Sequence, residues 1–221
     1  MPISDFSSHD PDFSADQVAE CARIIAGLRE IGTKVVRLSG AVEELRAAGD
    51  RVEALSQSLD AVTQSRAIET FRFGFDLDDP NAVMPFNPAT GAFNPVAPEL
   101  DMKVADERLI TELVFSSRYE SAPDSVQGGM VSALYDQLLA FAVMIHGKTG
   151  PSASLEVKFL KRTPIEERLR FETWVEKVEE DRFHACGACW FGDTQISEAS
   201  GVILGKYDLP VSTGAELKRG V

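Results

Sequence analysis

The chain has 221 residues, of which 44% are hydrophobic, and a formal net charge of −13. This length accommodates one domain of ordinary size and an extension, with enough apolar residues for a core. The acidic balance argues against nucleic acid or an anionic membrane surface as the main partner.

The cysteine and histidine content limits the kinds of catalytic and metal sites that the chain can form. Three cysteines and three histidines are present, too few for a histidine-rich metal site or a Ser-His-Asp triad to be expected. Cys186 and Cys189 have the spacing of a redox or zinc half-site, but no second pair exists, and in a strand they would point to opposite faces. We therefore expect no metal, no cofactor, a reducing cytoplasmic location and chemistry based on a carboxylate. The N-terminus is polar and acidic, without the pattern of a secretory signal.

The first part of the chain predicts a helical hairpin, which we place in an extension over residues 1–70. Ser14 and Gln17 form a capping box, and the helix that follows has room to bend at Gly32 or Gly40. We expect a break at Gly49–Asp50. The apolar positions are Val18, Ile24, Ile25, Leu28, Ile31, Val35, Leu38, Val42, Leu45, Val52, Leu55, Leu59 and Val62. This stripe favours packing on the chain's own domain or on a sister subunit, and a coiled coil for another partner is the alternative.

The remaining chain predicts an α+β fold. Residues 71–106 are expected to form a connecting strand, from the alternation of Phe71, Phe73 and Phe75, and a loop rich in Pro and Asn. Residues 107–210 form the main domain, with a C-terminal tail at 211–221. Its strand-like runs are 109–119, 152–160, 169–178, 183–191 and 195–207, with one apolar helix between the first two.

That helix, predicted over 130–145, carries one charged residue, Asp136. The run is too short to span a membrane. Burying a carboxylate is costly unless it is hydrogen-bonded, so Asp136 should touch a polar cavity or have a raised pKa, as suits a catalytic base. The alternative is an aspartate that faces solvent or caps a loop.

Two glycines, Gly128 and Gly129, precede the helix. They allow a ligand to approach the backbone, where the free N–H groups of the first turn can polarise a carbonyl oxygen. A plain tight turn before a helix is the alternative.

In residues 108–207 these features share their order and spacing with a known family. The matching residues are Tyr119–Glu120, Val126–Gly129, Asp136, Ser152–Leu160 and Ala199–Gly201. This part of the chain resembles the hotdog-fold acyl-CoA thioesterases related to the phenylacetate-degradation enzyme, the PaaI-like branch. The resemblance implies a curved antiparallel sheet wrapped around one long helix, preceded here by the N-terminal helical extension.

The resemblance also implies an activity, the hydrolysis of an acyl-CoA thioester to free acid and CoA. Asp136 would be the nucleophile or general base, and the N–H of Gly128 or Gly129 the oxyanion donor. Ser152, contributed across a dimer interface, would hydrogen-bond the attacking water or the carboxylate; a local turn bond is the alternative for this residue. The protein would be a homodimer or tetramer, since an open sheet leaves strand edges to be paired.

The chain departs from the family pattern before the helix. Gln127 stands where histidine is usual, and we expect it to orient a hydrogen bond rather than carry a proton. Ser121 stands where some members have Asn or Gln, and the family's Pro-Pro-Gly loop is Ala-Pro-Asp at 122–124. A non-catalytic protein that binds acyl-CoA or another hydrophobic ligand is therefore the alternative function.

Basic residues gather after the helix in an otherwise acidic chain. Lys158, Lys161 and Arg162 end one strand run, and Arg168 and Arg170 begin the next. The first three are candidate contacts for the CoA phosphates, and a solvated hairpin end is the alternative.

Overall fold

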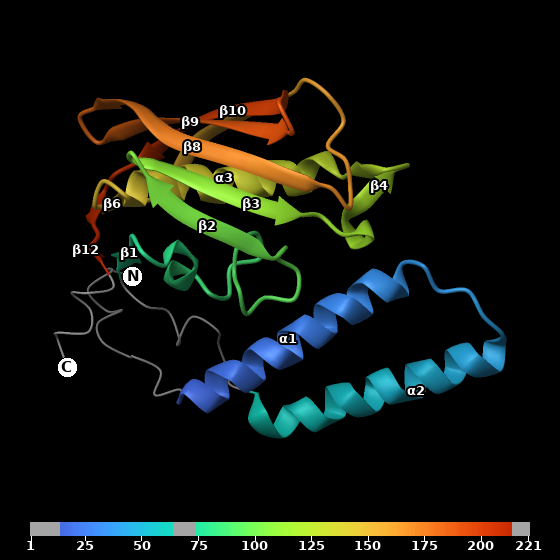
Figure 1. Cartoon of the computed structure of the whole chain (residues 1–221). Coiled ribbons are helices and arrows are strands. Elements are labelled where there is room, and N and C mark those ends of the chain that lie inside the picture. Colours follow the sequence, from blue (N-terminus) through green and yellow to red (C-terminus); the bar gives the residue numbers. More distant parts are fainter. Residues whose placement is uncertain (1–13, 64–73, 214–221) are drawn as a thin grey trace.

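The structure, a computed structural model, describes residues 14–63 and 74–213 (Figure 1). Our predictions for Met1–Phe13, for Phe71 and Phe73, and for the tail after residue 213 lie outside this part. A large antiparallel sheet curves around helix α3, and a helical hairpin lies on the other side of α3 from the sheet's crest (Figure 1).

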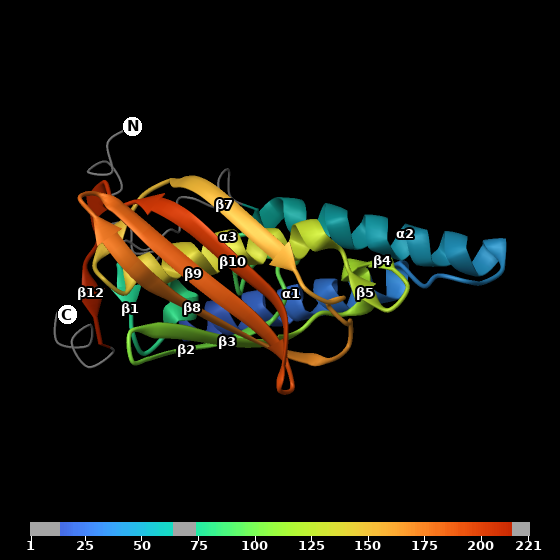
Figure 2. The same ribbon diagram turned by 90° about the horizontal axis from the view of Figure 1, so that it is seen from above.

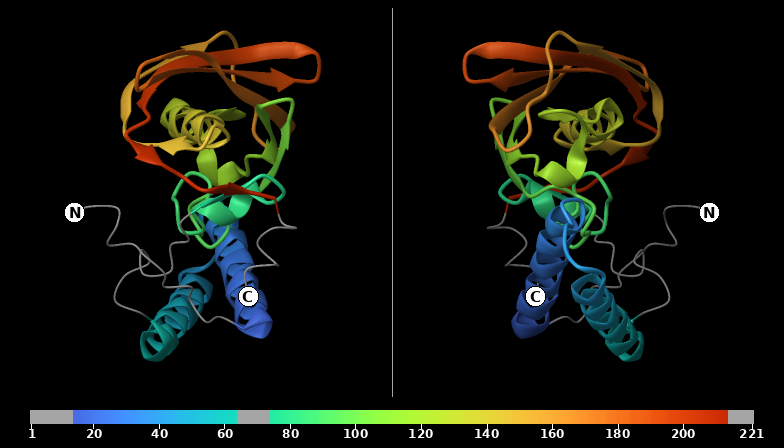
Figure 3. Two further views of the ribbon diagram at one scale, coloured as in Figure 1. Left: turned by 90° about the vertical axis from the view of Figure 1, so that its left-hand side faces the viewer. Right: turned by 90° about the vertical axis from the view of Figure 1, so that its right-hand side faces the viewer.

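The large sheet has six strands in the order β2-β3-β8-β9-β10-β7, and every neighbouring pair is antiparallel. Its strands are β2 (Leu100–Ala105), β3 (Arg108–Val114), β7 (Ser152–Phe159), β8 (Arg168–Glu179), β9 (Arg182–Phe191) and β10 (Thr194–Leu204). β2 and β7 are the two edges. Seen end-on, the sheet arches over α3 (Figure 3).

Helix α3 (Gly128–Met144) lies in the hollow of this sheet and supplies nine buried residues to the core. Tyr135 is fully buried, and its hydroxyl lies 2.9 Å from Ser197 Oγ on β10. Thr173 of β8 donates a hydrogen bond of 3.0 Å to the carbonyl of Leu138. These bonds satisfy polar groups that would otherwise be costly to bury, and they fix the rotation of the helix under the sheet.

Short elements close the sides of the domain. They are β1 (Phe75–Asp76), η4 (Pro80–Val83), η5 (Ser117–Tyr119), β4 (Glu120–Ala122), β5 (Ser125–Val126), β6 (Lys148–Thr149), β11 (Tyr207–Asp208) and β12 (Val211–Ser212). β1 and β12 form a two-stranded parallel pair, and the segment with η4 lies beside α3 opposite the arch (Figure 3). Phe75 is fully buried and its ring packs against Phe141 of α3.

The N-terminal hairpin consists of α1 (Ala15–Val35) and α2 (Val42–Leu59), followed by η2 (Asp60–Val62). The capping box between Ser14 and Gln17 is confirmed. The break expected at Gly49–Asp50 is wrong, because α2 runs through both residues. It begins instead after Ala41, whose N–H donates to the Glu44 carboxylate at 3.0 Å. Among the described residues, no helix is long and apolar enough to cross a membrane.

Strand β2 is an addition to the predicted elements. It falls in the segment that we expected to be a connecting strand and loop, yet it pairs with β3 along its whole length. The fold class is as predicted, an α+β arrangement of one helix wrapped by a curved antiparallel sheet.

Candidate active site

Asp136 lies on the one side of α3 that the domain leaves uncovered. Gly129, Ala133 and Asp136 are exposed, at spacings that place them on one face of the helix, whereas neighbouring positions such as Leu134 and Tyr135 are buried. The expectation of a buried carboxylate is therefore wrong for the single chain. The stripe of small residues leaves Asp136 accessible to a ligand or to a second copy.

Ser152 is the hydrogen-bond partner of Asp136, with Oγ donating to Oδ1 at 2.8 Å. Both residues belong to the same chain, so this pair forms without a second subunit. A β-bulge in β7 places Ser152 where its hydroxyl can reach Asp136. The register of β7 on β10 shifts between Val202 and Ile203, so that Ile203 faces Ser152 while Val202 faces Ser154. The extra residue turns Ser152 onto the α3 side of the strand.

Gln127 is the N-cap of α3, and its side-chain oxygen accepts a hydrogen bond of 2.9 Å from the N–H of Met130. Its own N–H donates to the carbonyl of Tyr119 at 2.8 Å. Within the described residues, the N–H groups of Gly128 and Gly129 make no hydrogen bond. Gln127 thus satisfies one free donor of the first turn and leaves the two glycine donors open to an anion or a carbonyl oxygen.

Phe159 stands beside these free donors. A Cβ atom placed on Gly128 would lie 3.3 Å from Phe159 Cζ, so the glycine lets this ring pack against the helix N-terminus. Phe159 is 50% exposed and Leu155, on the same strand, is 37% exposed. The β7 edge therefore presents apolar side chains and unpaired backbone next to the candidate site.

One chain does not assemble the whole site. Gly129 and Asp136 are seven residues apart on a helix, which corresponds to about 10 Å along its axis. A reacting carbonyl must lie about 3 Å from both the attacking group and the oxyanion donor. The Asp136–Ser152 pair and the glycine donors of the same chain therefore cannot act on one carbonyl group.

The basic residues separate into two groups. Lys158 forms an ion pair of 3.2 Å with Glu198, while Arg168 and Arg170 pair with Glu112 and Glu172 at 2.6 and 2.7 Å. Lys158 also lines a hollow of about 410 Å³ on the sheet face away from α3, with Trp174 and Trp190. Lys161 and Arg162 are exposed, come shortly after Phe159, and form no ion pair in the described part of the chain. Only these two remain close to the glycine donors and free for a phosphate.

The Cys186 and Cys189 pair does not form a site. Cys189 is fully buried, whereas Cys186 lies on the other face of β9 and contacts the Glu176 carboxylate at 3.4 Å. Burial raises the pKa of Cys186 to about 11 and that of Cys189 to about 12, so both thiols stay protonated near neutral pH. No group of metal-ligating residues occurs in residues 14–63 and 74–213.

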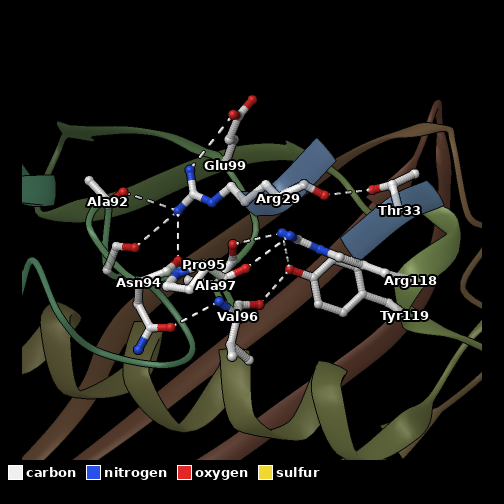
Figure 4. A network of polar contacts seen from close by, with 11 residues as sticks. Arg29, Thr33, Ala92, Asn94, Pro95, Val96, Ala97, Glu99, Arg118 and Tyr119 are labelled. Atoms are coloured by element: carbon white, nitrogen blue, oxygen red, sulfur yellow. Dashed lines mark hydrogen bonds and ion pairs between the residues drawn. The ribbon is translucent and has the colours of Figure 1, made fainter. Parts of the chain in front are cut away.

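Sequence reasoning missed a polar network that ties the hairpin to the loop before β2 (Figure 4). Arg29 of α1 has a side chain only 12% exposed, and its Nη2 lies 3.1 to 3.2 Å from the carbonyl oxygens of Gly91, Ala92 and Asn94. Burial lowers the pKa of this guanidinium. An arginine inside an amphipathic helix next to apolar positions was the only signal in the sequence.

A second arginine extends the network to the candidate site. Arg118 donates to the carbonyls of Pro95 and Ala97 and to the Tyr119 hydroxyl, which in turn donates to the carbonyl of Val96 at 2.6 Å. Tyr119 accepts through its backbone carbonyl from Gln127, the N-cap of α3. The loop, the hairpin and the start of α3 are thus connected by hydrogen bonds. Figure 4 shows the bonds made by Arg29, Arg118 and Tyr119.

Comparison with known proteins supports the fold. No family model and no curated protein matches the chain. A thioesterase superfamily protein, RHA08564, has a crystal structure similar to 83% of this chain and 94% of its own, with a TM-score of 0.73 and 20% identity. This similarity shows that the chain has the hotdog fold. The E. coli PaaI protein of the phenylacetic acid degradation operon matches 51% of this chain and 83% of its own, with a TM-score of 0.47 and 12% identity. A Streptococcus pneumoniae thioesterase protein solved with coenzyme A matches 50% of this chain and 90% of its own, with the same score and identity.

Proposed function

We propose that the protein is a cytoplasmic acyl-CoA thioesterase of the PaaI-like kind, acting as a homodimer. The observation that carries this proposal is the hydrogen-bonded pair of Asp136 and Ser152 on the uncovered face of α3. Asp136 would act as general base toward water or as nucleophile, with Ser152 fixing its orientation. Gly128 or Gly129 would supply the oxyanion donor.

The site would be completed by a second copy paired along β7. Ser152 lies at one end of this strand and Phe159, which packs on Gly128, lies at the other. If two antiparallel copies of β7 pair about their centre, Ser152 of one copy falls opposite Phe159 of the other. That arrangement brings the Asp136–Ser152 pair of one chain beside the glycine donors of the second chain. Two chains are needed because, within one chain, the pair and the glycine donors are too far apart to act on the same carbonyl group.

The substrate would enter with its phosphates near the end of β7. Lys161 and Arg162 follow Phe159 and form no ion pair among the described residues, so they are our candidates for the CoA phosphates. Lys158 is a weaker candidate, because Glu198 already neutralises it. The exposed Leu155 and Phe159 side chains would line the path of the acyl group.

The activity is tested by thiol release from short, long and aromatic acyl-CoAs, with Asp136→Asn as the variant. Asparagine keeps the shape but is neither a base nor a carboxylate nucleophile, so turnover should fall by about 10²-fold or more. Acyl-CoA binding and thermal stability should be retained. Equal turnover of both proteins would remove Asp136 from the mechanism, and binding without turnover in either protein would establish the non-catalytic alternative.

The two-chain site is tested by mixing two inactive variants. Proline at position 128 or 129 removes one N–H from the first helical turn, but its Cβ also crowds Phe159 or Gln127. The variant that loses turnover and keeps wild-type thermal stability therefore identifies the oxyanion donor. This proline variant is then mixed with Asp136→Asn under conditions that exchange subunits. Half of the dimers should contain one chain of each variant, and one of the two sites in such a dimer has both its carboxylate and its N–H donor. The mixture should therefore recover about a quarter of wild-type activity. No recovery after verified exchange would show that each chain supplies a whole site.

A further inference from the structure

Helix α2 is amphipathic, yet nothing in the described chain covers its apolar side. Leu45, Ala48, Val52, Leu55 and Leu59 repeat at alternating spacings of three and four residues, which places them on one line. No residue of α2 is buried. Because most helical stability in proteins comes from packing an apolar face, α2 gains little of that stability within the described chain.

Helix α1 presents a second apolar line while being fixed to the domain. Arg29 holds it to the loop before β2, and Thr33 donates a hydrogen bond of 3.2 Å to Ser116. Four of its apolar positions also repeat at spacings of four and three residues, and two of them are more than a third exposed. These positions are Ile24, Leu28, Ile31 and Val35. The hairpin of one chain therefore offers the uncovered apolar line of α2 and the partly uncovered one of α1.

The hairpin lies where a second copy would arrive. Seen from above, α2 lies on the same side of the domain as the β7 edge and extends past the end of the sheet (Figure 2). The end-on views agree, with α2 below the β7 side and α1 nearer the middle (Figure 3). A copy that pairs along β7 would bring its own hairpin to the same side.

The charges of α2 argue against an anionic lipid surface as the partner of its apolar side. The helix carries four acidic residues and two basic ones, and no charged residue lies on its apolar line. Helices that bind anionic lipid surfaces are instead rich in Lys and Arg on the polar face. An apolar line with neutral residues at spacings of three and four is typical of helix-to-helix packing.

We propose that the apolar line of α2 packs on the α1–α2 hairpin of a second copy, so that two hairpins form an intermolecular helix bundle. Its geometry rests on the β7 pairing of the proposed function. The bundle would be a second interface of the dimer, separate from the catalytic residues, and would tether two chains that each hold half of a site.

The experiment compares Leu55→Glu with Ala54→Glu, which adds the same charge one residue away from the apolar line. Both positions are exposed in the single chain. The dimer dissociation constant is measured by analytical ultracentrifugation, and α2 amide exchange by mass spectrometry. We expect protected α2 amides in the wild type, and for Leu55→Glu a dissociation constant at least 10-fold higher with loss of that protection. Ala54→Glu should stay within about threefold of wild type in dissociation constant.

Equal dissociation constants for the two variants would overturn the proposal, because α2 would then pack only within its own chain or not at all. A monomeric wild type or unprotected α2 amides in the wild-type dimer would do the same. The dimer can be too tight for its dissociation constant to be measured. In that case the amide exchange of α2 in Leu55→Glu decides, and α2 amides that stay protected in this variant would overturn the proposal. Thiol release from acyl-CoA is measured on the same samples. A wild-type protein that releases thiol but has unprotected α2 amides would overturn the helix bundle and leave the proposed function standing. A wild-type protein with protected α2 amides but no thiol release would overturn the proposed function and leave the helix bundle standing.

Discussion

At the scale of single residues, one inserted amino acid decides where the Asp136 carboxylate finds its partner. Without the bulge in β7, side chains would alternate strictly, and Ser152 would lie on the same face as Ser154, away from α3. With the bulge, Ser152 Oγ reaches Asp136 at 2.8 Å. The geometry of the candidate base therefore depends on backbone register as much as on the identity of the side chain.

Ser152→Ala should lower thioester hydrolysis by about 10-fold or more, because a hydrogen bond to a charged group contributes about 1.5–3 kcal/mol. Folding stability should change little, since Ser152 is exposed. Ser154→Ala, on the other face of the strand, is the matched control and should keep wild-type turnover. Steady-state kinetics of both variants checks this, and identical kinetics for the two would mean that the hydrogen bond has no part in turnover.

The residues of the candidate site were predictable, but their grouping was not. A lone carboxylate in an apolar helix, two glycines before it and a serine that opens the next strand were all visible in the sequence. The exposure of Asp136 was not, because apolar composition does not show which face of a helix the fold leaves open. The side-chain cap made by Gln127 was also missed, because glutamine is not among the preferred N-cap residues.

At the scale of elements, alternation of apolar and polar residues predicted β3, β7, β8, β9 and β10. In β2, Leu100, Met102 and Val104 alternate with Asp101 and Lys103 in the same way, but we assigned this segment to the loop rich in Pro and Asn. The turn between β2 and β3 has positive φ at Asp106 and Glu107. A hairpin is usually predicted from Asn-Gly or Asp-Gly at such positions, and this pair lacks the glycine. The error at Gly49 has a similar cause, since a single glycine costs a helix only about 1 kcal/mol.

Gly187→Ala tests how closely α3 approaches the sheet. A Cβ atom there would lie 2.8 Å from Thr173 Cγ2 and 3.1 Å from the ring of the buried Tyr135. Overpacking of this kind should lower the free energy of unfolding by about 1–3 kcal/mol, measured by urea denaturation. Gly49→Ala, which meets nothing within 4 Å on the exposed surface of α2, should have no such cost. Equal stability losses in both variants would contradict the close approach of helix and sheet.

At the scale of the whole molecule, two arginines join parts that are distant in the sequence. Arg29 connects α1 to the loop before β2, and Arg118 connects that loop to Tyr119 and hence to the start of α3. Carbonyl oxygens, which no pattern of side chains reveals, make up most of the partners. The sequence therefore predicted the hairpin and its packing on the domain or a sister subunit, but not the two arginines that attach it.

Arg29→Ala should detach α1 from the domain, because several carbonyl groups lose a charged donor in a partly buried setting. We expect a loss of about 3 kcal/mol in stability and faster proteolysis within α1, measured by thermal unfolding and limited digestion. Arg23→Ala is the control, since Arg23 is exposed and, among residues 14–63 and 74–213, pairs only with the exposed Glu20 at 2.7 Å. A hairpin equally resistant to proteolysis in both variants would show that other contacts hold it.

The uncovered edge of β7 has a consequence for how activity responds to protein concentration. If a working site needs the carboxylate of one chain and the amide of another, a solitary chain is only half of a catalyst. The rate per chain should then fall as the protein is diluted below its dissociation constant, approaching a second-order dependence on protein concentration. Substrate that bridges two chains would counteract dilution, so that the acyl thioester would promote assembly of the site that consumes it.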